Sequence, residues 1–124
     1  MVFISPWRNY LKIYLAGKMR GVPNFNFPAF MEAAKVLRSS GHEVFNPAQR
    51  DVIKYGPSVG DSLTGDFKDI EHLGFSLREA LAADTTYICQ CADAVVLLPG
   101  WEQSKGAVAE KTLAEALGLE VFYY

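Results

Sequence analysis

The sequence predicts an α/β fold, a Rossmann- or flavodoxin-like three-layer sandwich with a parallel sheet of about four to five strands and helices on both faces. Two observations favour this class. Short apolar runs alternate along the chain with amphipathic helical segments. Most of these runs lack alternating polar residues, so we expect the strands to be buried on both faces. A length of 124 residues suits one such domain, covering residues 1–124, and is too short for two.

The first half of the chain supplies two strands and a helix. Lys12–Ala16 is an apolar run that indicates a buried strand. Residues 25–40 have helical periodicity and predict an amphipathic helix. Glu43–Asn46 is expected to be a second short strand, stopped by Pro47. Residues 2–4 are a candidate for a further edge strand.

Residues 48–75 are the least regular part of the sequence. Glycines and prolines interrupt every long periodic pattern there, at Gly56, Pro57, Gly60, Gly65 and Gly74. We expect a flexible loop with one short helical turn around Asp66–Leu73. Loops of this length in a compact domain are usually functional lids or partly disordered.

The second half repeats the alternation of helix and strand. Residues 76–91 predict a helix with Ser76 as its N-cap. Ala94–Leu98 is a continuous apolar strand, residues 104–117 predict a helix that ends before Gly118, and Glu120–Tyr124 is a final strand. Parallel sheets bind ligands beyond the carboxyl ends of their strands, so the loops after the strands are the places to look for a site.

Composition excludes some classes of function. The formal charge of −2 does not suit a protein that holds duplex nucleic acid by electrostatics. No apolar run approaches the ~20 residues of a membrane span, and the start lacks the apolar core of a signal peptide, so we expect a cytoplasmic protein. Cys89 and Cys91 have neither disulfide nor usual zinc spacing. We expect two buried thiols on a helix, no metal and no cofactor.

Two of these loops have residues that suit an anion such as phosphate. The loop after the first strand contributes Gly17, Lys18, Met19, Arg20 and Gly21, in which the glycines allow close backbone approach and the cations supply charge. An ordinary loop with two solvated cations would have the same composition.

The loop after the third strand contributes Gly100, Trp101, Ser104 and Gly106. Ser104 is placed to cap the following helix, and a helix N-terminus is a ready anion site. A plain N-cap serine is the alternative. Trp101, together with Phe25, Phe27 and Phe30, either stacks on a nucleobase or belongs to the core.

Glu110 stands out because a helix repeat of ~100° per residue places it in the middle of an apolar stripe. The stripe consists of Ala107, Leu113, Ala114 and Leu117. The side chain of Glu110 points back over Gly106 and Ala107, which leaves space around its carboxylate. Buried carboxylates are rare and often functional, although a structural hydrogen bond could also hold one.

Asp84 repeats this oddity in the preceding helix, inside a stripe of Leu77, Leu81 and Ile88. If the two carboxylates meet at one cleft, one can attack a sugar carbon while the other protonates the leaving group. Tyr14 on the first strand could donate a hydrogen bond that orients one of them. Asp84 could instead be a local cap, and Tyr14 a core residue.

These residues resemble the nucleoside 2-deoxyribosyltransferase-like superfamily, particularly a phage and bacterial branch. The similarity starts at about Lys12 and rests on the motifs IYLAGKMRG at 13–21, FPAFMEAAKVLRSSGHEVFNP at 27–47, CADAVVLLPGW at 91–101 and SKGAVAE at 104–110. The resemblance implies that Glu110 is a nucleophile forming a covalent glycosyl ester, that Tyr14 orients it, and that Asp84 handles the base or its protonation. It also implies a homodimer or a larger homo-oligomer.

Within that superfamily, the motif is most similar to the 2′-deoxynucleoside 5′-monophosphate N-glycosidases. Ser104 stands where transferases of free nucleosides have an aspartate, which would repel a phosphate. Arg20 also matches the monophosphate branch, whereas Lys18 departs from it. The expected function is hydrolysis of the N-glycosidic bond of a (deoxy)nucleoside 5′-monophosphate. Base exchange by a 2-deoxyribosyltransferase and a non-catalytic nucleotide-binding module remain alternatives, and the cytokinin-activating phosphoribohydrolases rank lower because their double glycine and threonine are missing here.

Overall fold

The computed structural model describes residues 4–5 and 9–124. At its centre is a sheet of four strands: β1 (Lys12–Ala16), β2 (Glu43–Phe45), β3 (Ala94–Leu97) and β4 (Glu120–Tyr123). All strand pairs are parallel, in the order β2-β1-β3-β4, so the predicted parallel sheet is confirmed. The candidate edge strand at residues 2–4 lies, apart from Ile4, outside the described residues.

The strand order creates a switch point between β1 and β3. The chain leaves β1 toward β2 on one side and returns on the other side to β3. Connections that depart in opposite directions from neighbouring strands open a crevice at their carboxyl ends. Tyr14 lies in the middle of β1, in register with Phe45 of β2 and Val95 of β3.

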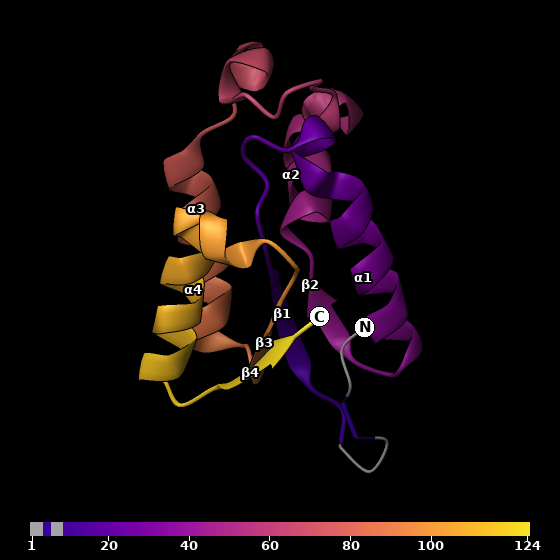
Figure 1. Cartoon of the computed structure of the whole chain (residues 1–124), viewed down its shortest axis with the longest axis vertical. Helices are drawn as coiled ribbons and strands as arrows, with labels where there is room; N and C mark the ends of the chain where they lie inside the picture. Colours follow the sequence, from indigo (N-terminus) through magenta and orange to yellow (C-terminus); the bar gives the residue numbers. More distant parts are fainter. Residues whose placement is uncertain (1–3, 6–8) are drawn as a thin grey trace.

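Helices cover both faces of the sheet and complete the three layers. They are α1 (Phe27–Ser39), α2 (Pro47–Tyr55), α3 (Leu77–Gln90) and α4 (Lys105–Ala116). Figure 1 shows α1 on one side of the sheet and α3 with α4 on the other. Short 3-10 segments lie between these elements: η1 (Pro23–Asn26), η2 (Pro57–Gly60), η3 (Phe67–Leu73) and η4 (Trp101–Gln103).

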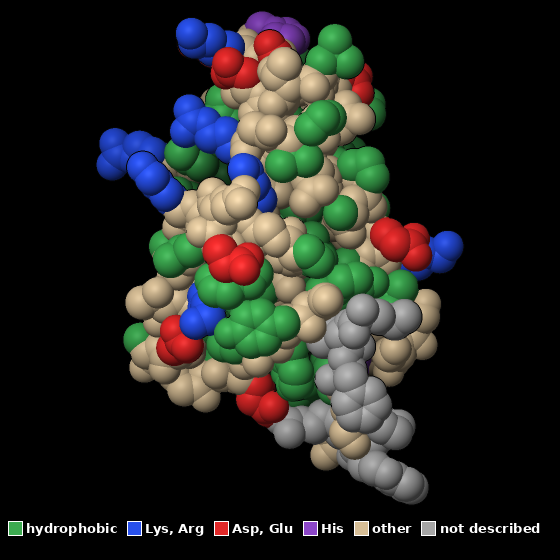
Figure 2. Space-filling view, in the orientation of Figure 1, with side chains coloured by type: hydrophobic (Ala, Val, Ile, Leu, Met, Phe, Trp, Pro, Cys, Tyr) green, Lys and Arg blue, Asp and Glu red, His purple; other side chains and the backbone are tan. Residues whose placement is uncertain are grey.

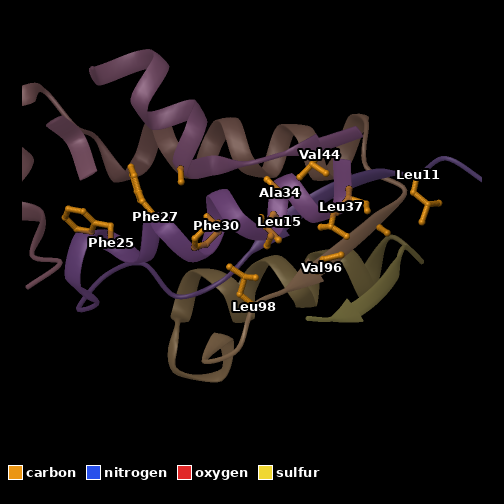
Figure 3. Close-up of a cluster of buried hydrophobic side chains, with 14 of the residues drawn as sticks. Leu11, Leu15, Phe25, Phe27, Phe30, Ala34, Leu37, Val44, Val96 and Leu98 are labelled. Atoms are coloured by element: carbon orange, nitrogen blue, oxygen red, sulfur yellow. The ribbon is translucent and has the colours of Figure 1, made fainter. Parts of the chain in front are cut away.

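The larger core lies between α1 and the sheet. Side chains of β1 alternate, so Ile13 and Leu15 point to this face. Figure 3 shows Leu15 beside Phe30 and Leu37 of α1 in this cluster. Ile13, Leu15 and Phe30 have no exposed surface, and burial of each contributes about 1.5–3 kcal/mol. This cluster of apolar side chains anchors β1 and α1.

The smaller core lies between the sheet and the pair α3 and α4. It contains Tyr14 and Ala16 of β1, Ile88 of α3, and Ala107 and Ala114 of α4. The polar atoms on this face come from Tyr14, Asp84 and Glu110, which are all buried. A sheet face with small residues and buried polar groups has room for a ligand.

Two sequence predictions need correction. The loop expected from residue 48 is wrong over its first part, because Asn46 accepts a hydrogen bond from the Ala48 N–H and Pro47 begins α2. The helical turn expected around Asp66–Leu73 is present as η3. Cys89 and Cys91 are exposed rather than buried, since they lie at the solvent-facing end of α3.

The helix starts and apolar stripes follow the sequence closely. The side chain of Ser76 accepts a hydrogen bond from the Glu79 N–H at 3.2 Å, and that of Ser104 accepts one from the Ala107 N–H at 3.1 Å. Both predicted N-caps are therefore confirmed. At the ends of the two stripes Leu77 and Leu117 are exposed, because the cores cover only the middle turns of α3 and α4.

Candidate active site

A cavity of about 620 Å³ opens at the carboxyl ends of β1 and β3, at the switch point. Its lining comes from β1 and the loop after it, from the first turn of α1, from α2, α3 and the first turns of α4, and from the 3-10 segments η1 to η4. Figure 2 shows Lys and Arg side chains gathered at the same end of the molecule. The cavity thus has buried acidic groups at its floor and basic groups near its mouth.

Glu110 forms part of the floor, from the second turn of α4. Its residue surface is only 6 % exposed. Tyr14 is 1 % exposed, and its hydroxyl donates a hydrogen bond of 2.5 Å to Oε2 of Glu110. Short hydrogen bonds of this kind to a carboxylate are charge-assisted and strong. Phe45 stacks on the Tyr14 ring at 5.6 Å and holds it in place.

Asp84 reaches the same cavity from α3. It is 7 % exposed, and its Oδ1 lies 3.5 Å from Nη2 of Arg50 on α2. Its charge acts on both Glu110 and Tyr14. Three side chains from β1, α3 and α4, all singled out in the sequence, therefore meet at one place.

Burial sets the proton affinities of this group. Burial raises the pKa of Glu110 to about 8. The hydrogen bond from Tyr14 lowers this pKa, and the nearby charge of Asp84 raises it further. Burial also raises the pKa of Asp84 to about 6, against the effect of Arg50. The pKa of Tyr14 is raised well above 10, first by burial, so it stays a donor. Between about pH 6 and 8 the two carboxyls together hold one proton.

The mouth of the cavity is formed by the two loops predicted to bind an anion. Gly17, Lys18, Met19 and Arg20 line it from β1, and Ser104 and Gly106 line it from α4. Lys18 Nζ lies 3.5 Å from Oε1 of Gln103, which links the loops. In an α-helix the first N–H groups have no carbonyl partner, so the start of α4 offers donors to the cavity.

Close packing fixes the loop after β1. A Cβ atom on Gly17 would lie 3.0 Å from Cβ of Leu98 and 3.2 Å from Cζ of Phe30, so only glycine fits without a shift. Asn26 donates a hydrogen bond of 3.0 Å to the carbonyl of Lys18. These contacts hold the loop backbone against the cavity.

Three residues predicted for the site do not line the cavity. Gly21 donates its N–H to the Gly65 carbonyl at 2.9 Å and has a φ of 84°, so it serves a turn. Gly100 likewise has a left-handed φ of 92° and begins η4. The centre of the Trp101 ring lies 5.9 Å from that of the Tyr123 ring, and the Lys111 ammonium lies over the Trp101 ring. This is because η4 turns the Trp101 ring toward β4. Phe25, Phe27 and Phe30 do line it.

Sequence reasoning missed the contribution of α2 and η3. Arg50 and Asp51 line the cavity from α2, and Phe67 lines it from η3, with the Arg20 guanidinium 4.6 Å from its ring centre. The signal that could have found α2 is Asn-Pro at 46–47, an N-cap followed by proline at the first helical position.

Within the described ranges, no group of three or more His, Cys, Asp or Glu side chains could hold a metal ion. Over the same residues, no helix combines the length and apolar character needed to cross a membrane.

The fold and cavity define a flavodoxin-like α/β protein with a buried carboxylate pair at its switch point. Compared with known families, residues 11–123 match the model described as Domain of unknown function (DUF4406), and the chain belongs to this family. Comparison with curated proteins and with solved structures gives no match.

Proposed function

We propose that this protein hydrolyses the N-glycosidic bond of a (deoxy)nucleoside 5′-monophosphate, with Glu110 as nucleophile. The observation that carries the proposal is the hydrogen bond of 2.5 Å from Tyr14 to a glutamate that is 6 % exposed, in a cavity shared with Asp84. A purely structural glutamate has no need of a second buried carboxylate beside it, since like charges repel.

In the proposed reaction, Tyr14 orients the Glu110 carboxylate, and one of its oxygens attacks the anomeric carbon. The bond from that carbon to the base nitrogen breaks, and its electron pair leaves with the base, which takes a proton from Asp84. Water then attacks the glycosyl ester, gives a proton back to Asp84, and releases Glu110 as a carboxylate. Between about pH 6 and 8 the pair holds one proton, which lies mainly on Glu110 because its pKa is the higher. The reactive form is the one in which this proton is on Asp84 and Glu110 is ionised, and that form supplies both the nucleophile and the acid.

The mouth of the cavity supports a monophosphate as substrate. Ser104 carries no charge, Gly106 leaves open space at the first turn of α4, and Lys18 and Arg20 face the same mouth. A helix N-terminus and two cations attract an anion, and a phosphate held there would place the sugar above Glu110. The resemblance to the monophosphate N-glycosidases points the same way.

The test is incubation of the protein with a panel of nucleosides and nucleoside 5′-monophosphates, both ribo and deoxyribo, followed by chromatography for free base. Release from monophosphates but not from nucleosides is expected. Release of the base only when a second base is added, with exchange of the two, would favour the hypothesis of a deoxyribosyltransferase. Tight binding of nucleotide with no free base would favour a capture module.

The proposal extends to the setting of the reaction. The substrate is a small nucleotide, with no duplex nucleic acid or membrane as partner, and the enzyme is cytoplasmic. The resemblance further implies a homodimer or larger homo-oligomer. Light scattering coupled to size-exclusion chromatography tests this, and a mass of one chain would contradict it.

A further inference from the structure

Arg20 is a cation at the mouth of the cavity that no carboxylate neutralises. It lines the cavity from the loop after β1 and is exposed. Among the described residues the ion pairs are made by Arg50, Lys54 and Lys111, and none involves Arg20. The partner of Arg20 is instead an aromatic ring, because its Cζ atom lies over the ring of Phe67, 4.6 Å from the ring centre.

The ring of Phe67 is itself held by other aromatic side chains. Phe25 of η1 stacks on it with ring centres 5.8 Å apart and an angle of 22° between the planes. Phe75, just before α3, packs against it with ring centres 5.1 Å apart. These rings come from three separate segments of the chain and all line the cavity. The surface on which the Arg20 guanidinium lies is therefore fixed by packing.

The backbone just before Phe67 is also joined to the loop that carries Arg20. The Gly21 N–H donates to the Gly65 carbonyl at 2.9 Å, and the Asn24 N–H donates to the Ser62 carbonyl at 2.7 Å. A Cβ atom on Gly65 would overlap the Val22 carbonyl, so the two segments approach as closely as their backbones allow. Residues 62–65 thus support the loop after β1.

This arrangement changes what Arg20 can do for an anion. An exposed arginine has many rotamers, and a ligand that it binds has to be attractive enough to offset the loss of this freedom. A guanidinium that lies over a ring has already lost part of it. Its N–H donors point outward along its edge, where they match two oxygens of one phosphate.

We infer that Phe67 is a positioning residue: it holds the Arg20 guanidinium over its ring and leaves the N–H edge free for two oxygens of a phosphate at the mouth of the cavity. The inference rests on the proposed function for the phosphate, which there belongs to a nucleoside 5′-monophosphate. Phe67 acts through Arg20 and needs no contact with the substrate. The segment expected from the sequence to be a flexible loop thereby supports the anion-binding loop.

The test uses inorganic phosphate as the probe, at constant ionic strength, and follows the Nε–H signal of Arg20 by ¹⁵N NMR. Arg20→Lys identifies this signal. In Phe67→Leu the ring is lost, so we expect the signal to move toward that of a free arginine and the dissociation constant for phosphate to rise about two- to fivefold. Phe67→Tyr keeps the ring and should bind phosphate like the wild type.

A double-mutant cycle separates positioning from a general loosening of the site. Arg20→Gln should weaken phosphate binding about tenfold, followed by the backbone N–H signals at the start of α4, and Phe67→Leu should then add no further loss. An unchanged dissociation constant in Phe67→Leu, or an equal rise in the Arg20→Gln background, would overturn the inference.

Tyr55→Leu is the matched control. It removes a half-buried ring that has the Lys54 ammonium 5.4 Å from its centre and does not line the cavity. We expect the dissociation constant for phosphate to stay at the wild-type value. A loss as large as that in Phe67→Leu would assign the effect to packing and overturn the inference.

Kinetics link the positioning to the proposed reaction. In Phe67→Leu we expect KM for a nucleoside monophosphate to rise about two- to fivefold with kcat little changed, and Phe67→Tyr should restore it. If the phosphate titrations behave as expected but the wild type releases no base from any nucleotide, the positioning stands and the proposed function fails. If base is released with the same KM in Phe67→Leu as in the wild type, the positioning fails and the proposed function stands.

Discussion

At the scale of single residues, the Glu110 carboxylate is costly to bury. Taking an ionised carboxylate out of water costs several kcal/mol, whereas one hydrogen bond from Tyr14 to a charged acceptor contributes about 1.5–3 kcal/mol. The balance remains unfavourable, which is why the pKa of Glu110 is raised. A group that costs stability where it lies is a candidate for function rather than for holding the fold together.

Replacing Glu110 tests the nucleophile. Glu110→Gln keeps the shape of the side chain but removes the attacking oxygen anion, so we expect base release to fall at least about a thousandfold. The matched control is Glu115→Gln on the same helix, where the carboxylate is exposed and pairs with Lys111. Chromatography for free base measures both. Equal activity of Glu110→Gln and the control would contradict the assignment.

Tyr14 offers a milder test of the same site. Tyr14→Phe removes the hydroxyl that orients Glu110, and we expect kcat to fall about a hundredfold with KM little changed. Loss of this hydrogen bond should also raise the pKa of Glu110 further, which moves the activity profile to higher pH. The control is Tyr87→Phe, which removes a hydroxyl that donates a hydrogen bond to Glu43 outside the cavity. An unchanged kcat in Tyr14→Phe would contradict a catalytic role of the hydroxyl and would indicate that Tyr14 serves only in the core.

At the scale of elements, α4 combines two tasks in one helix. Ser104 caps its first turn and lies at the mouth of the cavity, and Glu110 projects from its second turn to the floor. One rigid helix therefore sets the spacing between the anion-binding end and the nucleophile. Small residues at Gly106 and Ala107 leave the room that a sugar needs.

A substitution at the N-cap of α4 tests phosphate binding without loss of helix stability. Ser104→Asp keeps a good N-cap, so thermal stability should hold, but its charge should raise KM for a monophosphate at least about tenfold. Ser76→Asp makes the same change at the start of α3, where we expect no effect on KM. Steady-state kinetics and melting curves measure both outcomes. An unchanged KM in Ser104→Asp would place the phosphate elsewhere.

At the scale of the whole molecule, three buried carboxyls couple the site to stability. The pKa values of Glu110, Asp84 and Asp51 are raised by burial, from 4.5 to about 8 for Glu110 and from 3.8 to about 6 for the aspartates. The folded state therefore binds more protons than the unfolded state between about pH 4 and 8. The stabilisation that these three carboxyls contribute by binding protons in the folded state is fully present below about pH 4, and it is lost as the pH rises to about 8.

We expect the melting temperature to fall by at least about 4 °C from pH 5 to pH 8. Glu110→Gln should flatten the part of this dependence between about pH 6 and 8, because its amide does not titrate. Calorimetry at a series of pH values measures the curve. A melting temperature that rises toward pH 8 in the wild type would contradict burial of these groups in their ionisable form.

The sequence alone determined the layers and the identity of the catalytic candidates. Apolar runs without polar alternation specify strands buried on both faces. An acidic residue in the middle of an apolar helical stripe departs from the helical periodicity and can therefore be recognised in the sequence. Tyr14, Asp84 and Glu110 could be singled out in this way because each breaks a local pattern or stands in a recognisable motif.

Only the tertiary structure decided which of these residues meet and what surrounds them. Arg50 and Asp51 could not be singled out, since charged residues on a short helix are usually solvated, and only the return of the chain from β2 to β3 brings them beside Asp84. Trp101 was equally suited to a ligand or to the core, and the turn at Gly100 directed its ring to Tyr123. Local periodicity encodes which face of an element is buried, whereas the partner on the other side of that face depends on contacts between residues far apart in the chain.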